Sequence, residues 1–263
     1  MTTPLVTRGQ LDRLYDKLNR RDFLSPDPLQ VVYEYPDPAD QEIVGLIAAG
    51  LAYGRVASIL QSIDRVLTVL GPHPHQRLRE DPAPLIRELG DFQHRWTTQA
   101  EMADLFRGLH ELLNQHDSLQ ALFLKHYRSR HDTVIPALTA FSQAISPNAN
   151  SLISRPDKGS ACKRLHMYMR WMVRSDDIDP GCWPEISPSK LIVPLDTHMF
   201  NIAKQLGLTT RNQANLATAL EVTAGYAKLR PRDPVRYDFA LTRLGIRSDT
   251  DLDAWLRRVT GKT

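Results

Sequence analysis

Lys163 and Asp196 are the two side chains whose types and surroundings could support chemistry. Lys163 lies near the start of the basic segment "GSACKRLHMYMRWMVR", and Asp196 opens a predicted helix in "VPLDTHMFNIAKQLGL". A lysine amine can act as a nucleophile, and a fixed carboxylate can stabilise positive charge that develops in a reaction. Each residue also has an ordinary explanation, because most helical lysines are solvated and aspartate is a favoured helix N-cap worth about 1 kcal/mol.

The segment that contains Lys163 is strongly basic. Residues 151–174 hold six lysines and arginines against one aspartate. Helical spacing places Lys163, Arg170 and Arg174 on one face, away from an apolar stripe. The small residues in "RPDKGSACK" just before them favour a tight turn into a helix N-terminus, where backbone N–H groups can bind phosphate. The segment therefore predicts either a phosphate-binding turn with a cationic helix or a merely solvated basic surface.

The elements that must position these residues are predicted to be helices, because apolar residues recur at three and four positions along most of the chain. Two helices flank "AYGR" at residues 52–55, and Gly71-Pro72 ends the second. The remaining predicted helices are 8–20, 83–90, 97–115, 117–130, 133–145, 161–174, 197–206, 212–228, 234–244 and 249–260. Alternating β patterns are missing apart from the brief "LQVVYEY", so we predict an all-α fold. The proline-containing stretch 175–190 is predicted to be an irregular loop that packs down through Trp183 and Ile186.

Composition narrows the class of protein. With 263 residues, 42% of them hydrophobic and 24% charged, the chain can bury a proper core. No run approaches the roughly 20 apolar residues of a membrane span, and no signal peptide is evident. We therefore expect a soluble cytoplasmic protein without a membrane partner. Its two cysteines, Cys162 and Cys182, are too few for a four-cysteine metal site and are expected to be reduced.

Charge and other motifs add two observations. Residues 1–150 carry 15 lysines and arginines against 18 acids, whereas residues 151–263 carry 18 against 12. Such a basic C-terminal part is compatible with a polyanionic partner, although an excess of this size also occurs on ordinary solvated surfaces. Asp196 with His198 makes a poor metal site because neighbours two apart at a helix start point in different directions. Serine nucleophile motifs and glycine-rich nucleotide loops are absent from the sequence.

Together, "GSACK" and "VPLDTHMFNIAKQLGL" resemble the helix-hairpin-helix DNA glycosylases, the superfamily of endonuclease III and the 8-oxoguanine glycosylases. More narrowly, "KRLHMYMRWMVRSDDIDPGCW", "PSKLIVPLDTH" and "DPVRYDFALTRLGI" resemble DUF2400, a bacterial family of unknown function that belongs to this superfamily. The resemblance runs from about residue 40 to the C-terminus. Its most specific piece is the segment that contains Asp196.

The resemblance implies roles for particular residues. Lys163 and Asp196 would be catalytic, the lysine attacking C1′ of a deoxyribose and the aspartate stabilising positive charge on the sugar. The expected DNA contacts are Gly159, Ser160 and Ala161 in the hairpin turn, Arg164 and Arg170 on the basic helix, and Tyr53 and Arg55 in the loop that would fill the gap left by a flipped base. The expected base pocket consists of Tyr237, Asp238 and Phe239, with Trp171 in reserve. For the aromatic members a core position is the competing explanation.

The chain departs from the superfamily pattern in three ways. The hairpin keeps Gly159 but has Ala161 at the second glycine position. Residues 175–190 lengthen the stretch between Lys163 and Asp196 and introduce a rival nucleophile, Lys190. The iron–sulfur cluster of endonuclease III is impossible with two cysteines. The resemblance further implies an active-site cleft between two helical domains, one of residues 40–190 with the hairpin and Lys163, the other of residues 1–39 and 191–263 with Asp196.

The expected function is that of a DNA glycosylase with abasic-site lyase activity, which would excise a damaged base through a lysine Schiff base. By resemblance the favoured lesion is 8-oxoguanine. The resemblance implies that the partner is duplex DNA with a damaged base. It also implies that the protein is a monomer and is located at the bacterial nucleoid. The resemblance implies no cofactor other than a monovalent cation that could bind at the hairpin. The alternatives are a DNA-binding module of the same fold that lacks the chemistry, and a helical scaffold that binds other proteins.

Overall fold

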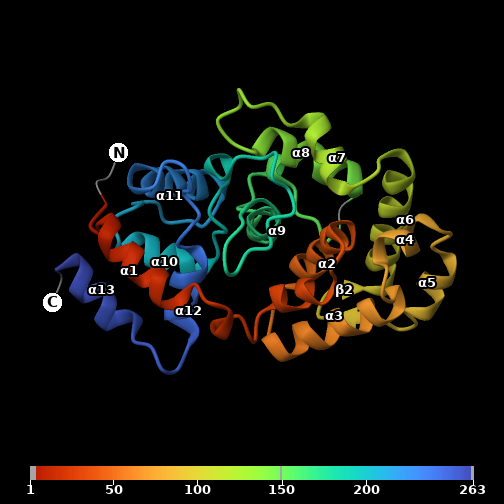
Figure 1. The fold of residues 1–263 in the computed structure, drawn as a ribbon, viewed down its shortest axis with the longest axis horizontal. Helices are drawn as coiled ribbons and strands as arrows, with labels where there is room; N and C mark the ends of the chain where they lie inside the picture. Colours follow the sequence, from red (N-terminus) through yellow and green to blue (C-terminus); the bar gives the residue numbers. More distant parts are fainter. Residues whose placement is uncertain (1–3, 149, 262–263) are drawn as a thin grey trace. The chain divides into compact units, whose positions relative to one another are not determined.

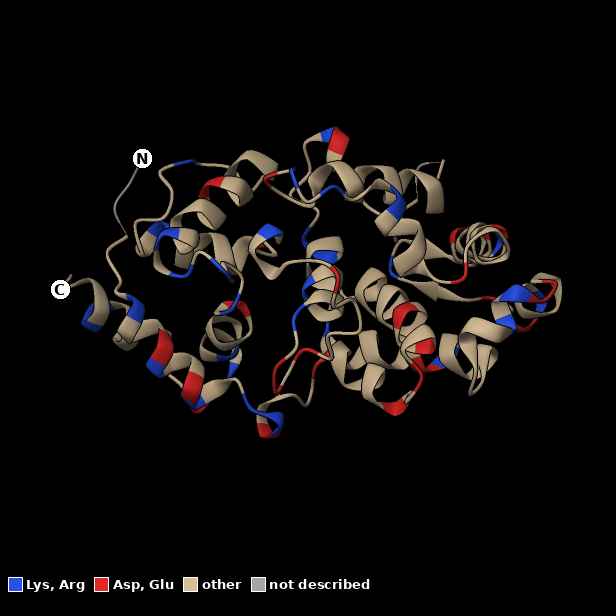
Figure 2. Ribbon diagram, turned by 45° about the horizontal axis from the view of Figure 1, so that its top comes forward, with Lys and Arg blue, Asp and Glu red and all other residues tan. Residues whose placement is uncertain are grey.

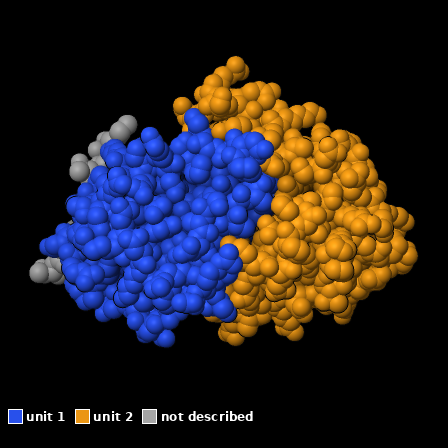
Figure 3. All heavy atoms as spheres, viewed as in Figure 1, with its two compact units in different colours: residues 1–25, 158–263 blue, residues 26–157 orange. Residues whose placement is uncertain are grey.

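The computed structural model describes residues 4–148 and 150–261, and within these ranges the chain is mostly helical (Figure 1). This confirms the all-α prediction at the level of secondary structure. The chain divides into two compact units, which Figure 3 distinguishes by colour. Unit 1 comprises residues 1–25 and 158–263, and unit 2 comprises residues 26–157. Acidic and basic residues occur along the ribbon in both units (Figure 2).

Unit 2 is a group of helices around α2 (Pro38–Leu51). The Asp37 carboxylate accepts a hydrogen bond of 2.9 Å from the Ala39 N–H, and Pro38 has the φ angle that a first helical turn requires. The apolar run that follows is buried on nearly all sides of the helix. The helices that pack against α2 are η2 (Pro28–Glu34), α3 (Val56–Leu70), α4 (Pro74–Arg79) and α7 (Leu119–His126). Further elements are α5 (Ala83–Glu88), α6 (Gln99–Gln115) and α8 (Ile135–Ile145).

Two details of unit 2 differ from the sequence prediction. The segment "LQVVYEY" forms the 3-10 helix η2 instead of a strand, because Asp27 caps it and Pro28 starts it with a helical φ. A short antiparallel hairpin, β1 (Gln93–His94) and β2 (Thr97–Thr98), precedes α6 where a helix had been predicted to begin at residue 97. The Thr98 side chain then caps α6 in a capping box with Glu101, so that helix begins at residue 99.

Unit 1 contains the two residues of chemical interest. Its helices are α1 (Arg8–Leu18), η1 (Arg21–Phe23), α9 (Lys163–Val173), η4 (Pro188–Lys190), α10 (Thr197–Gln205), α11 (Leu216–Leu229), α12 (Asp238–Ile246) and α13 (Leu252–Thr260). Helix α12 packs against both α1 and α10. The irregular stretch 175–190 does pack down, since Trp183 and Ile186 are buried.

The compact units have other bounds than the domains expected from the sequence. Residues 158–190, which include α9, belong to unit 1 together with Asp196 instead of to the unit of α2. The physical reason is that buried ion pairs and core side chains of α9 join it to α12 and to the 175–190 stretch. Among the described residues, none of the helices is both long enough and apolar enough to cross a membrane.

Candidate functional site

Lys163 and Asp196 are neighbours in unit 1. The Lys163 Nζ atom lies 3.9 Å from Oδ2 of Asp196. Their side chains are 31% and 45% exposed, so both remain accessible to a ligand. Lys163 is the first residue of α9, and Asp196 is the N-cap of α10. The starts of two helices that are 33 residues apart in sequence therefore bring an amine and a carboxylate together.

The two oxygens of Asp196 have different surroundings. Oδ1 accepts a hydrogen bond of 2.9 Å from the Met199 N–H, which is the ordinary capping interaction of an aspartate. Oδ2 faces the Lys163 amine, which also contacts the sulfur of Met167 at 3.5 Å. Capping therefore holds the carboxylate in place without occupying the oxygen that faces the amine. Asp196 can therefore cap α10 and take part in chemistry at the same time.

The turn before α9 is tight and exposed at Gly159 and Ser160. Gly159 has φ +75°, which suits glycine, and Cys162 has the left-handed φ of +44°. The Ser160 hydroxyl accepts a hydrogen bond of 3.2 Å from the Cys162 N–H. Ala161, at the expected second glycine position, is buried, and the second left-handed residue is its neighbour Cys162. The element before the turn is the 3-10 helix η3 (Pro156–Lys158), so the turn joins this short helix to α9.

Two of the three cations on the face predicted for α9 are buried. The side chains of Arg170 and Arg174 are 5% and 4% exposed. Arg174 pairs with Asp176, Asp179 and Asp233. The arginines thus serve as counter-ions for carboxylates of unit 1, and Arg170 in this position does not present a guanidinium to a DNA phosphate. Arg164 remains partly exposed at the first turn of α9.

Asp238 connects this buried network to the start of α9. Arg170 donates one hydrogen bond to Asp238 at the start of α12 and another, of 3.1 Å, to Asp179. Burial raises the pKa of Asp238, and the positive charges of Arg170 and Lys163 oppose that shift. The Asp196 carboxylate contributes a further raising effect. Asp238 is therefore within electrostatic reach of both residues of the candidate site.

The residues expected to form a base pocket lie in the core of unit 1. Tyr237, Phe239 and Trp171 are at most 2% exposed, and Asp238 is 7% exposed. The Tyr237 hydroxyl donates a hydrogen bond of 2.8 Å to Asp12 of α1. None of the four offers an open face to a base in this conformation. The core explanation weighed for the aromatic residues fits their burial.

Tyr53 and Arg55, which were expected to fill the gap left by a flipped base, lie in unit 2 between α2 and α3. Arg55 is exposed at the N-cap of α3. Tyr53 is held, because its hydroxyl donates a hydrogen bond of 2.8 Å to the His94 carbonyl. The Tyr53 ring stacks on Trp96 with 4.6 Å between ring centroids and 15° between planes. Tyr53 is therefore one layer of a stack and not a freely projecting side chain.

Trp96 is the exposed layer of that stack and was missed in the sequence. It is 56% exposed, and the Arg95 guanidinium lies 4.6 Å from its ring centroid. Arg95 itself has a left-handed φ of +54° at the tip of the β1–β2 hairpin. The available signal was a tryptophan inside the polar run "QHRWTTQ", just before a capping box. A tryptophan in such a turn has no apolar periodicity that would place it in a core.

The other candidates do not assemble into a site. Lys190, the rival nucleophile, lies at the end of η4, and Lys163 is the lysine that pairs with Asp196. In the described part of the chain, no group of three or more histidines, cysteines and acids could hold a metal ion. Cys162 is buried and Cys182 is half-buried, and the Cys182 thiol contacts the sulfur of Met172 at 3.3 Å.

Comparison with known proteins gives a match to a family model. The family model described as "Protein of unknown function (DUF2400)" matches residues 27–247, which is most of the chain. No curated protein and no solved structure matches the sequence. The matched range includes α9, the 175–190 stretch and the helix that Asp196 caps. The chain therefore belongs to the DUF2400 family.

Proposed function

We propose that this protein is a DNA glycosylase with abasic-site lyase activity. The observation that carries the proposal is the pair formed by Lys163 and Asp196, 3.9 Å apart and both partly exposed. The motif resemblance to helix-hairpin-helix glycosylases supports the reaction class and favours 8-oxoguanine in duplex DNA as the lesion. Within unit 1, the pair supplies the nucleophile and the carboxylate that this reaction requires.

Asp196 has the geometry of an electrostatic stabiliser. When the bond between base and C1′ breaks, positive charge accumulates on the sugar, and a fixed carboxylate lowers the energy of that state. The Met199 N–H fixes Oδ1 at 2.9 Å, so Oδ2 needs little reorganisation to face the charge. This preorganisation is the contribution that a helix N-cap can make to catalysis.

Lys163 is the proposed nucleophile. The amine has to lose a proton to water before it attacks C1′, because the Asp196 carboxylate beside it must keep its negative charge to stabilise the sugar. Attack breaks the bond between C1′ and the base, which leaves with the bonding electrons and takes a proton from water. One of the two amine protons moves to O4′ as the sugar ring opens, which gives a protonated Schiff base between Nζ and C1′. Loss of a proton from C2′ then expels the 3′ phosphate and cleaves the strand. Hydrolysis of the Schiff base frees the lysine for another turnover.

Two features support DNA as the substrate. The exposed turn at Gly159 and Ser160 leads into α9 with Arg164 on its first turn, an arrangement suited to a phosphate. In unit 2, Trp96 is 56% exposed beside Tyr53 and Arg95, and nucleobases stack on aromatic side chains with about 1–3 kcal/mol per base.

The test is borohydride trapping on a duplex that contains 8-oxoguanine, with an abasic-site duplex in parallel. Borohydride reduces the Schiff base to a stable amine, so wild-type protein should become covalently attached to the DNA. Lys163→Ala should abolish the adduct, and Asp196→Asn should slow base release on the order of a hundredfold or more. Lys158→Ala, which removes an exposed lysine five residues before Lys163, is the matched control.

The same experiment separates a second candidate function. Because Asp196 also caps α10, the ion pair could serve the fold alone, in a DNA-binding protein without the chemistry. That function predicts salt-dependent duplex binding that survives Lys163→Ala and Asp196→Asn, with no base release by the wild type. A wild-type protein that forms no adduct with either duplex contradicts the lyase proposal.

A further inference from the structure

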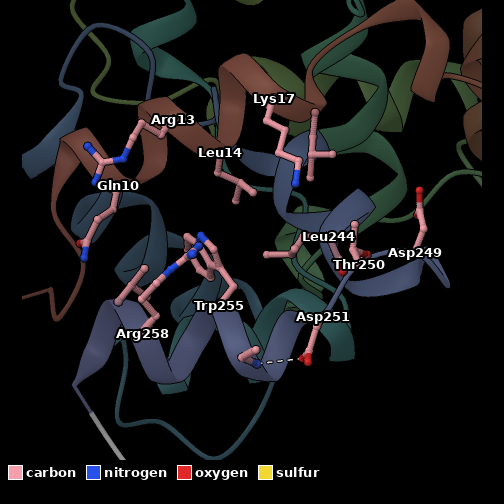
Figure 4. A pocket seen from close by; sticks show the side chains of 13 residues that line it. Gln10, Arg13, Leu14, Lys17, Leu244, Asp249, Thr250, Asp251, Trp255 and Arg258 are labelled. Carbon is pink, nitrogen blue, oxygen red and sulfur yellow. Dashed lines mark hydrogen bonds between the residues drawn. The ribbon is translucent and has the colours of Figure 1, made fainter.

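A concave pocket of about 640 Å³ lies in unit 1 between α1, α13 and the connection from α12 to α13 (Figure 4). Its volume is in the range of small-molecule sites, which is roughly 300–1,000 Å³. Figure 4 shows Arg13 and Lys17 reaching it from α1, and Trp255 and Arg258 from α13. All of its lining belongs to one compact unit, and neither Lys163 nor Asp196 contributes to it.

Two of the three cations that line this pocket have no acidic partner in the parts of the chain that the structure describes. Arg13 and Arg258 are exposed, and neither has an ion-pair partner within the described ranges. Asp249 at the rim is already bound by Arg247 through two hydrogen bonds of 2.7 Å. Arg247 and, more weakly, Lys17 lower the pKa of this carboxyl.

The second acid of the rim is also occupied. Asp251 accepts a hydrogen bond of 2.8 Å from the Ala254 N–H as the N-cap of α13, the bond drawn as a dashed line in Figure 4. Asp249 therefore has an ion-pair partner and Asp251 a capping role, whereas Arg13 and Arg258 have no ion-pair partner among the described residues. Their guanidinium N–H groups are available as donors to a ligand.

The floor of the pocket is apolar. It is made by buried side chains, namely Leu14, Leu18, Leu244, Trp255 and Val259. A ligand that fits must therefore combine an anionic group for the arginines with an apolar or planar body for the floor. Guanidinium groups bind phosphate with paired, charge-assisted hydrogen bonds, and two arginines with a lysine suit a doubly charged phosphate.

We infer that this pocket binds the phosphate and attached nucleoside of a nucleotide, either free or as part of a nucleic-acid strand. The concave pocket of about 640 Å³ has room for one nucleotide. Arg13 and Arg258 contact the phosphate, and the nucleoside covers the floor beside Trp255. This site is separate from the proposed active-site pair and does not depend on its chemistry.

Calorimetric titration of the full chain with adenosine 5′-monophosphate tests the inference. We expect binding of the monophosphate at least about tenfold tighter than that of adenosine, because the charge-assisted contacts are lost without the phosphate. Arg13→Gln and Arg258→Gln should each weaken binding about tenfold. Arg257→Gln is the matched control, since Arg257 is exposed on the same helix and does not line the pocket. Melting temperatures of the three variants check that the fold is kept.

Competition separates the two sources of the phosphate. If a duplex oligonucleotide displaces the monophosphate, the site serves nucleic acid, and if it does not, the site serves a free nucleotide. Equal affinity for adenosine and its monophosphate, no binding at about 10 mM, or unchanged binding by both pocket variants would overturn the inference. Lys163→Ala should bind the monophosphate as the wild type does, so failure of the lyase proposal and failure of this inference give different results.

Discussion

Replacement of Arg174 by methionine should destabilise unit 1 more than any change at a surface ion pair. The Arg174 side chain is 4% exposed and pairs with three carboxylates, of which Asp179 is fully buried. Methionine roughly keeps the volume of the stem but removes the charge. The variant therefore removes the arginine that pairs with Asp176 and Asp233 and leaves Asp179 with Arg170 alone, and the loss of one partner of a buried ion pair costs about 3–5 kcal/mol in other proteins.

The charge balance of the network predicts which of its residues is the most costly to replace. Two arginines, Arg170 and Arg174, face the four carboxylates of Asp176, Asp179, Asp233 and Asp238. The network has more acids than bases, so loss of an arginine increases the imbalance while loss of an aspartate reduces it. Asp179→Asn should accordingly cost less than Arg174→Met, about 1–3 kcal/mol for the altered hydrogen bonds.

Urea unfolding followed by tryptophan fluorescence measures both variants. Trp171 and Trp183 are fully buried in unit 1 and report on the surroundings of α9. Arg211→Met is the control, because its ion pair with Glu221 is exposed and should contribute less than about 1 kcal/mol. A free energy of unfolding for Arg174→Met within about 1 kcal/mol of wild type, or a larger loss for Asp179→Asn, would refute the reasoning.

Three further predictions follow from single residues. His166 is fully buried, and burial lowers its pKa to about 3, so the free energy of unfolding should fall as pH drops from about 6.5 towards 3. Between pH 7 and pH 5, the free energy of unfolding of His166→Leu should fall by about 2 kcal/mol less than that of the wild type, as measured by urea titration. Gly181→Ala should be far more destabilising than Gly159→Ala in thermal melts, because both have positive φ but only at Gly181 would a Cβ lie 2.7 Å from the Arg174 carbonyl oxygen. Trp96→Ala should weaken binding to an abasic-site duplex about tenfold by fluorescence anisotropy, and an unchanged affinity would exclude Trp96 as a stacking surface.

Helical periodicity was sufficient to predict most of the helices. The predicted helix 161–174 corresponds to α9, and 249–260 corresponds to α13. The errors lie where local capping or proline decides the backbone, as at the 3-10 helix η2. These interactions involve one or two residues and leave no periodic signal.

The candidate pair was singled out by the resemblance of the two motifs that contain Lys163 and Asp196, and the structure places these side chains 3.9 Å apart. The burial of Arg170 was not predictable, since its partner Asp179 lies in the irregular stretch 175–190, where periodicity says nothing about position. An arginine face in sequence looks the same whether water or buried aspartates surround it. The exposure of Trp96 was not predicted either, because a single aromatic residue in a turn is not part of any periodic sequence pattern.

The most direct test is to identify the lysine that becomes attached to DNA. Wild-type protein trapped with borohydride on an 8-oxoguanine duplex is digested, and the modified peptide is sequenced by mass spectrometry. The account predicts the modification on Lys163, the lysine whose Nζ lies 3.9 Å from Asp196. Modification of Lys190 instead, or an absence of any adduct, would contradict it.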